Sequence, residues 1–289
     1  MSRLPISKTP KPYVGGAFIR SESGRTFPVK DAAGNFFANI PQCTRKDLRN
    51  AVEAAAKAGP GWAKRTAYNR GQILYRLGEM LEARRAEMIE TLVCFGVAKS
   101  AAAKETDTAV DRLIYYAGWA DKYEQVLGNV NPVASPFFNF TVTEPMGVVG
   151  VIAPDLPPLL PLISLIAPAI VSGNTVVGLA SEKTPYPAIL LGEMLATSDL
   201  PGGVVNLLTG FRKEMVPTFA THTHLRAISA AGVTAEERKA LRLGAAESVK
   251  RVQFAAAATE REWFAEAAQS LHAIRETLEF KTTWHPIGA

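Results

Sequence analysis

Five hydrophobic segments alternate with helix-length segments in the second half of the sequence, and this alternation constrains the fold most strongly. The five segments share nearly continuous apolar residues and lie at 148–153, 174–180, 203–209, 225–230 and 249–256. The intervening segments have the length and apolar spacing of helices and lie at 160–171, 188–197, 213–221 and 234–243. Strands that are apolar on both faces are typical of parallel sheets covered by helices on both sides. With right-handed crossovers, the pattern predicts a doubly wound α/β sheet of five parallel strands.

Further elements are predicted on either side of this sheet. Short alternating segments punctuated by glycine predict strands within residues 1–40. Four helices are then expected at 45–58, 66–85, 87–95 and 101–126, the first capped by Thr44 and ended by Gly59-Pro60-Gly61. A loop at 129–136, a strand at 137–143, a helix at 259–278 and a closing strand with the sequence LEFKTTWHP complete the prediction.

The composition excludes several classes of function. The net charge is only +5, from 32 basic and 27 acidic residues, and no run of five like charges occurs, so we expect no nucleic-acid partner. The longest apolar run, at 156–171, is interrupted by prolines and is too short to span a membrane. The two cysteines lie far apart and the N-terminus lacks the apolar core of a signal peptide, which indicates a cytoplasmic protein.

Four segments of the sequence resemble the aldehyde dehydrogenase superfamily in their order and spacing. They read KPYVGGAFIRSESGRTFPVKDAAG, EPMGVVGVIAP, GNTVVGLASEKTP and LPGGVVNLLTG, and the resemblance runs from Lys11 to about Thr234. It implies NAD(P)-dependent oxidation of aldehydes through a cysteine thiohemiacetal. It also implies a Rossmann-like nucleotide-binding domain, a catalytic domain and a β-flap, a hairpin plus a C-terminal strand, that serves oligomerisation.

The same resemblance divides the chain into four parts. It assigns 1–128 to the N-terminal strands and helices of the nucleotide-binding domain and 129–146 to the flap hairpin. The Rossmann-like sheet then occupies 147–258, and the C-terminal helix and flap strand occupy 259–289.

The residues that carry the family's catalysis do not match. Leu156 stands where the resemblance places an asparagine that stabilises the oxyanion, and losing one such donor typically costs ~10²–10³ in rate. After the fifth strand, VQFAAAATERE replaces the family's Glu-Leu-Gly-Gly-Lys-Ser, which contains the general base. The chain then reaches the flap strand without the catalytic domain or its cysteine. The sequence, including WAKRTAYNRGQILYR, is most similar to the shorter second domain of family-sixteen aldehyde dehydrogenases.

The residues that hold the cofactor in the family are mostly replaced as well. Glu182 remains from the pair that binds the adenosine ribose, but its lysine partner is missing, which favours a role in capping the helix that begins near Thr184. Gly210 precedes Phe211 and Arg212, where the family has Gly-Phe-Gly. Gly232 is the one glycine kept from Phe-Thr-Gly-Ser. We interpret Glu182, Gly210 and Gly232 as vestigial cofactor residues and expect no bound cofactor, or at most weak binding of NAD(P).

The remaining reactive side chains have simpler interpretations. Cys43 precedes a helix, which could lower its thiol pKa, but cysteine commonly packs as a small hydrophobic residue, and we favour that interpretation. Cys94 is flanked by apolar residues and is expected in the core. His222 and His224 have the spacing of metal ligands in an extended segment, but without a third ligand nearby we predict no metal site.

Four more residues are expected at the surface or at a strand end. His272 and His285 are predicted to lie at the surface or in an interface, and Lys250 and Arg251 are predicted to form a solvated strand end. These interpretations leave the chain without a predicted catalytic residue.

The flap is the part of the chain for which the sequence predicts a function. Its aromatic residues are expected to cover a partner and are Phe137, Phe138, Phe140 and Trp284. The hypothesis is a non-catalytic domain, a pseudoenzyme, that forms a homodimer through the flap or associates with a full-length aldehyde dehydrogenase. The alternative is an NAD(P)-dependent dehydrogenase whose catalytic cysteine comes from another chain or domain. A third option is a binding module for another small ligand in the crevice at the strand ends.

Overall fold

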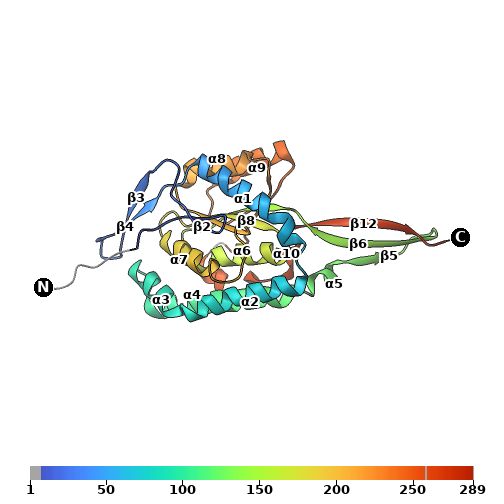
Figure 1. Cartoon of the computed structure of the whole chain (residues 1–289), viewed down its shortest axis with the longest axis horizontal. Helices are drawn as coiled ribbons and strands as arrows, with labels where there is room; N and C mark the ends of the chain where they lie inside the picture. Colours follow the sequence, from blue (N-terminus) through green and yellow to red (C-terminus); the bar gives the residue numbers. More distant parts are fainter. Residues whose placement is uncertain (1–7, 258, 289) are drawn as a thin grey trace.

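The computed structural model describes residues 8–257 and 259–288, and its main sheet has the predicted doubly wound arrangement (Figure 1). Its parallel strands are β7 (Val148–Ile152), β8 (Thr175–Leu179), β9 (Val205–Leu208), β10 (Leu225–Ala230) and β11 (Arg251–Phe254). The strand order is β11-β10-β7-β8-β9, as expected for a Rossmann-like sheet. Two short antiparallel strands, β1 (Tyr13–Val14) and β2 (Ala17–Phe18), extend the sheet beyond β9.

Helices cover both faces of this sheet, which explains why its strands are apolar throughout. One face packs against α6 (Leu160–Val171), α7 (Tyr186–Leu195), α2 (Ala67–Ala83), α3 (Arg85–Cys94) and α4 (Lys99–Trp119). The other face packs against α1 (Arg45–Ala63), α8 (Arg212–Thr221) and α9 (Ala235–Ser248). A separate hairpin of β3 (Thr26–Lys30) and β4 (Phe36–Pro41) lies beside the body. Among the described residues, no helix has both the length and the apolar character needed to cross a membrane.

A long three-stranded arm projects from this body and contains the predicted flap (Figure 1). Its central strand is β6 (Phe137–Pro145), with β12 (Leu278–Pro286) on one side and β5 (Asn129–Asn131) on the other. β6 and β12 are antiparallel and pair along their entire length, from Leu278 opposite Pro145 to Pro286 opposite Phe137. The structure therefore confirms the pairing of the C-terminal strand with FFNFTVT, and it adds β5 within the segment that was predicted to be a loop.

Two predicted helix boundaries are wrong in the first half of the chain. The first helix continues through Gly59-Pro60-Gly61 to Ala63. Its last turn is held in place by Trp62, which is buried and donates a hydrogen bond from Nε1 to the carbonyl oxygen of Ile170 at 2.8 Å. The helix predicted over 101–126 is divided into α4 and a short α5 (Tyr123–Leu127). Tertiary packing outweighs the local turn signal in the first of these cases.

The prediction of a continuous helix over 259–278 is also wrong. The segment instead forms two 3₁₀ turns, η1 (Glu260–Phe264) and η2 (Glu266–Ala268), followed by the short helix α10 (Leu271–Arg275). Arg112 of α4 supplies the physical reason, because its guanidinium donates hydrogen bonds to the carbonyl oxygens of Trp263 at 3.0 Å and Ala268 at 2.8 Å. These carbonyls are thereby satisfied without a regular helix.

Candidate functional site

The crevice at the carboxyl ends of the parallel strands is the place where open α/β sheets bind ligands, and it is the first candidate site. The strand order reverses between β7 and β10, and a cavity of about 690 Å³ opens there. The described residues that line it include Pro154, Leu156, Gly232, Arg238 and Trp263, and they include no cysteine or histidine. Leu156 is 49% exposed and brings an alkyl side chain, with no hydrogen-bond donor, to this crevice.

Arg212, the first residue of α8, spans the crevice from one loop to the other. Its guanidinium donates hydrogen bonds to the carbonyl oxygen of Ala153, after β7, and to that of Gly232 at 2.8 Å, after β10. The side chain also lies 3.9 Å from a carboxylate oxygen of Asp155 and is largely buried. Arg212 thereby joins the loops after β7 and β10 to the first turn of α8.

Glu182 is committed to the same network. Its carboxylate accepts a hydrogen bond from the backbone N–H of Arg212 at 2.8 Å, and its own N–H donates to the carboxylate of Asp155 at 3.1 Å. Glu182 therefore caps α8, whereas the sequence interpretation assigned it to the helix that begins near Thr184. A carboxylate at a helix N-terminus is favoured by the unpaired N–H groups and by the helix dipole.

The two glycines predicted as vestigial cofactor residues are required by local packing. Gly232 has a φ of +61°, and a Cβ atom there would lie 2.7 Å from Cβ of Pro154. Gly210 has a φ of +148°, and a Cβ atom there would lie 3.0 Å from the carbonyl oxygen of Cys43. Each position thus needs glycine for the backbone conformation and for the close approach of a neighbouring segment. The structure brings Glu182, Arg212 and Gly232 together at the crevice, while Gly210 packs against the turn before α1.

Neither cysteine has the environment of a nucleophile. Cys43 is fully buried, and this burial raises its thiol pKa to about 12. The helix that follows Cys43 therefore does not activate it, and packing as a small hydrophobic residue is the interpretation that fits. Cys94 was expected in the core but is only partly buried, and this burial raises its thiol pKa.

The histidines do not form a metal site in the described part of the chain. The rings of His222 and His224 lie 5.9 Å apart between centroids, and burial lowers the pKa of His222. Across residues 8–257 and 259–288, no cluster of three or more His, Cys, Asp or Glu side chains could hold a metal ion. His272 and His285 are exposed, and His272 lies 3.2 Å from the carboxylate of Glu276.

The prediction that Lys250 and Arg251 form a solvated strand end is wrong. Lys250 is only 7% exposed, and burial lowers its pKa to about 8. Its Nζ donates to the carbonyl oxygens of Ala220 and His222, both at 2.8 Å, at the C-terminal end of α8. Arg251 donates to two carbonyl oxygens of the segment that leads into β12. Both side chains therefore connect β11 to neighbouring elements; an alternating strand pattern gives no sign of such long-range partners.

The flap is the second candidate site, and its four predicted interface residues divide between two faces of the arm. Phe138 and Phe140 lie on one face with ring centroids 5.4 Å apart. Phe137 and Trp284 contact each other on the opposite face, with centroids 5.7 Å apart and an edge-to-face geometry. Three of these side chains are substantially exposed, with Trp284 at 57%, Phe138 at 44% and Phe137 at 36%. Large exposed aromatic residues on a projecting sheet are typical of a protein–protein contact.

Comparisons with known proteins agree with this architecture. Residues 18–282 match the model of the aldehyde dehydrogenase family. Similar relatives include an aldehyde dehydrogenase of Alternaria alternata, 34% identical over 83% of this chain and 48% of the relative. Retinal dehydrogenase 2 of Gallus gallus is 35% identical over 86% of this chain and 48% of its own length.

Solved structures show the same relationship. The NAD⁺ complex of an aldehyde dehydrogenase from Bacillus cereus is 27% identical, with a TM-score of 0.81 over 86% of this chain and 51% of that one. The crystal structure of a putative aldehyde dehydrogenase from Burkholderia cenocepacia is 30% identical, with a TM-score of 0.81 over 86% of this chain and 50% of that one. The chain spans about half the length of the curated relatives it matches. By sequence and by fold, this chain belongs to the aldehyde dehydrogenase family.

Proposed function

We propose that this chain is a non-catalytic aldehyde dehydrogenase-like domain that acts by association. It forms a homodimer through its flap or lends the flap to a complete aldehyde dehydrogenase. The observation that carries the proposal is the position of Arg212, whose guanidinium is bonded to Ala153 and Gly232 on both sides of the crevice. This guanidinium joins the loops after β7 and β10, so a dinucleotide that uses the backbone groups of Ala153 or Gly232 would first have to break these hydrogen bonds.

The chemistry of the surrounding side chains supports the same proposal. Aldehyde oxidation through a thiohemiacetal needs a thiolate, and Cys43 is buried with a pKa raised to about 12. The developing oxyanion needs a hydrogen-bond donor, and the corresponding side chain here is Leu156. We therefore expect purified chain to form no NADH from NAD⁺ and an aldehyde.

The flap supports the associative part of the proposal. Its outer strands β5 and β12 each have a partner on one side only within the described chain. Unpaired strand edges are usually covered by another chain, by charges or by irregular structure. On one face, Phe138, Phe140 and Val142 alternate along β6, and Val130 of β5 is the register partner of Phe140. Val142 and Val130 are 42% and 66% exposed, so an apolar surface continues along the arm.

The mass of the protein in solution tests this association. We expect light scattering to give the mass of a dimer, or of a complex when a complete aldehyde dehydrogenase of the same organism is added. Phe138→Asp places a charge on the apolar face and should shift the equilibrium to the monomer. Phe36→Asp is the matched control, because Phe36 is 63% exposed in β4, away from the arm, and it should leave the mass unchanged. Wild-type protein that stays monomeric both alone and with the dehydrogenase would contradict the proposal.

A second candidate function is a cofactor site that serves a cysteine from another chain. It is favoured by Glu182, which stands where the family has a glutamate that binds the adenosine ribose, and by the NAD⁺ complex of the Bacillus cereus relative. In that case the carboxylate of Glu182 would have to release the N–H of Arg212 to reach a ribose. The two functions differ in one observable, because only the second requires the chain to bind NAD(P).

A further inference from the structure

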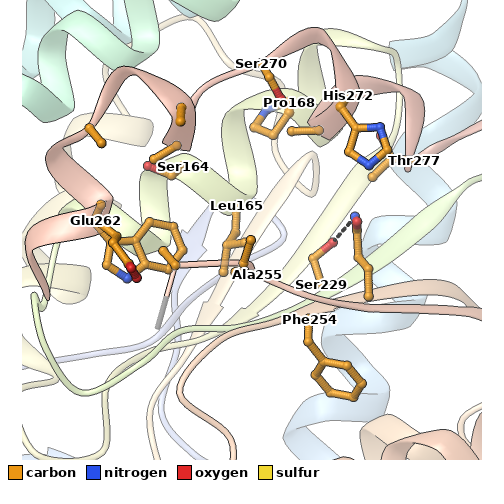
Figure 2. Close-up of a pocket in the computed structure, with 18 residues that line it drawn as sticks. Ser164, Leu165, Pro168, Ser229, Phe254, Ala255, Glu262, Ser270, His272 and Thr277 are labelled. Atoms are coloured by element: carbon orange, nitrogen blue, oxygen red, sulfur yellow. Dashed lines mark hydrogen bonds between the residues drawn. The ribbon is translucent and has the colours of Figure 1, made fainter. Parts of the chain in front are cut away.

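A second cavity, of about 490 Å³, lies on the face of the sheet that packs against α6 (Figure 2), opposite the face that packs against α8 and α9. It lies between α6, the strands β10 and β11, and residues of the segments 255–257 and 262–277. Most of its wall is apolar and comes from Leu165, Pro168, Trp263 and several alanines. The volume falls within the roughly 300–1,000 Å³ that is typical of small-molecule sites.

One polar pair lies on the sheet side of this cavity. Gln253 of β11 and Ser229 of β10 are register neighbours, and Nε2 of Gln253 donates to Oγ of Ser229 at 3.0 Å, the dashed line in Figure 2. Ser229 is only 4% exposed. Among the described residues, neither the hydroxyl hydrogen of Ser229 nor Oε1 of Gln253 has a hydrogen-bond partner. A buried donor and a nearby acceptor are thus available on the same wall.

The charges around the cavity favour a neutral ligand. Its described lining contains no lysine or arginine. Glu262 is engaged, because its carboxylate accepts a hydrogen bond from the N–H of Thr259 at 2.9 Å. His272 lies 3.2 Å from Glu276, so its ring already has an acidic neighbour. An anionic ligand would find no free cation here, and a cationic ligand would find no free carboxylate among these groups.

The outer wall of the cavity is held in place before any ligand binds. Arg112 is 1% exposed and donates hydrogen bonds to the carbonyl oxygens of Trp263 and Ala268 and to Oγ of Ser164 at 2.9 Å. These three residues line the cavity. One buried guanidinium therefore fixes the 3₁₀ turns against α6, and a preformed pocket lowers the entropy cost of binding.

We propose that this cavity binds a neutral, mainly apolar alcohol or phenol. A single hydroxyl group on the ligand satisfies both free groups, because it accepts from the hydroxyl of Ser229 and donates to Oε1 of Gln253. The apolar remainder of the ligand lies against Leu165, Pro168 and Trp263. This site is separate from the flap and does not depend on nucleotide binding.

The test compares 2-naphthol with naphthalene, which has the same rings but no hydroxyl. Fluorescence titration of the full chain at pH 7 should show saturable binding of 2-naphthol at one site, about 10-fold tighter than naphthalene, as expected for one or two hydrogen bonds. Ser229→Ala should reduce this preference to about 2-fold or less while leaving naphthalene affinity unchanged. Ser248→Ala, at the end of α9, is the matched control and should keep the preference.

Filling the cavity gives a second, independent test. Ala273→Phe introduces a ring into the lining and should weaken both ligands by more than about 10-fold. If this variant fails to fold, the ligand preference of Ser229→Ala decides the question. Absence of saturable 2-naphthol binding, or a preference that Ser229→Ala leaves intact, would overturn the proposal.

Discussion

The side chain of Arg212 carries the proposal that this chain does not bind the family's cofactor. The sequence places arginine where the family has glycine, so it predicts the loss of close backbone approach at the start of α8. It cannot predict where the guanidinium goes, because its partners Ala153 and Gly232 belong to loops after two other strands. The same limit applies to Lys250, whose acceptors become neighbours only after the sheet has formed.

A buried carboxylate, Glu105 of α4, should make stability depend on pH. Its Oε1 accepts from the backbone N–H groups of Leu159 and Leu160, and so caps α6 in place of a local side chain. Burial raises its pKa above the ordinary 4.5, so the native state binds more protons than the unfolded state just above that pH. The contribution of Glu105 to the free energy of unfolding should therefore fall as the pH rises from about 4.5 through its raised folded-state pKa.

Replacing this carboxylate isolates the effect. Glu105→Gln retains an acceptor oxygen but does not titrate, so urea unfolding between pH 4 and pH 8 should show a smaller decline for the variant than for the wild type. Glu90→Gln changes an exposed glutamate and should follow the wild-type profile. Parallel profiles for the wild type and Glu105→Gln would show that the carboxylate does not titrate as described.

At the scale of elements, the capping box of α9 gives a local prediction. Oγ1 of Thr234 accepts from the N–H of Glu237 at 3.2 Å, and Oε2 of Glu237 accepts from the N–H of Thr234 at 2.8 Å. Thr234→Ala should lower the free energy of unfolding by about 1 kcal/mol. Thr108→Ala is the control, because this threonine lies inside α4 and bonds only within its own helix, so its change should stay within roughly 0.5 kcal/mol. Equal effects in chemical denaturation would argue against the capping role.

The sequence predicts elements well where a local pattern determines them and poorly where a side chain distant in sequence determines where an element ends. All five parallel strands and the pairing of the C-terminal strand with FFNFTVT follow from apolar runs and the family resemblance. The end of α1 and the segment after β11 do not, because Trp62 and Arg112 form their decisive hydrogen bonds with residues more than a hundred positions away. Glycine-proline signals and helical spacing describe only the local preference.

The whole molecule consists of a two-sided α/β body and a projecting arm (Figure 1). The body has the family's sheet, with Leu156 lining the crevice and Arg212 joining the loops after β7 and β10. The arm retains a full β6–β12 ladder with aromatic residues on both faces. Under the proposed function this combination favours association, because large aromatic side chains are exposed on both faces of the projecting arm.

Calorimetric titration of the purified chain with NAD⁺ and NADP⁺ tests this account most directly. Arg212→Gly, which introduces the family's residue, serves as the comparison because it removes the guanidinium from Ala153 and Gly232. We predict no saturable heat for the wild type up to about 1 mM of either cofactor, which corresponds to less than about 4 kcal/mol of binding free energy. Saturable binding of NAD⁺ or NADP⁺ by the wild type with a dissociation constant in the micromolar range would contradict the proposal that the hydrogen bonds of Arg212 exclude the cofactor.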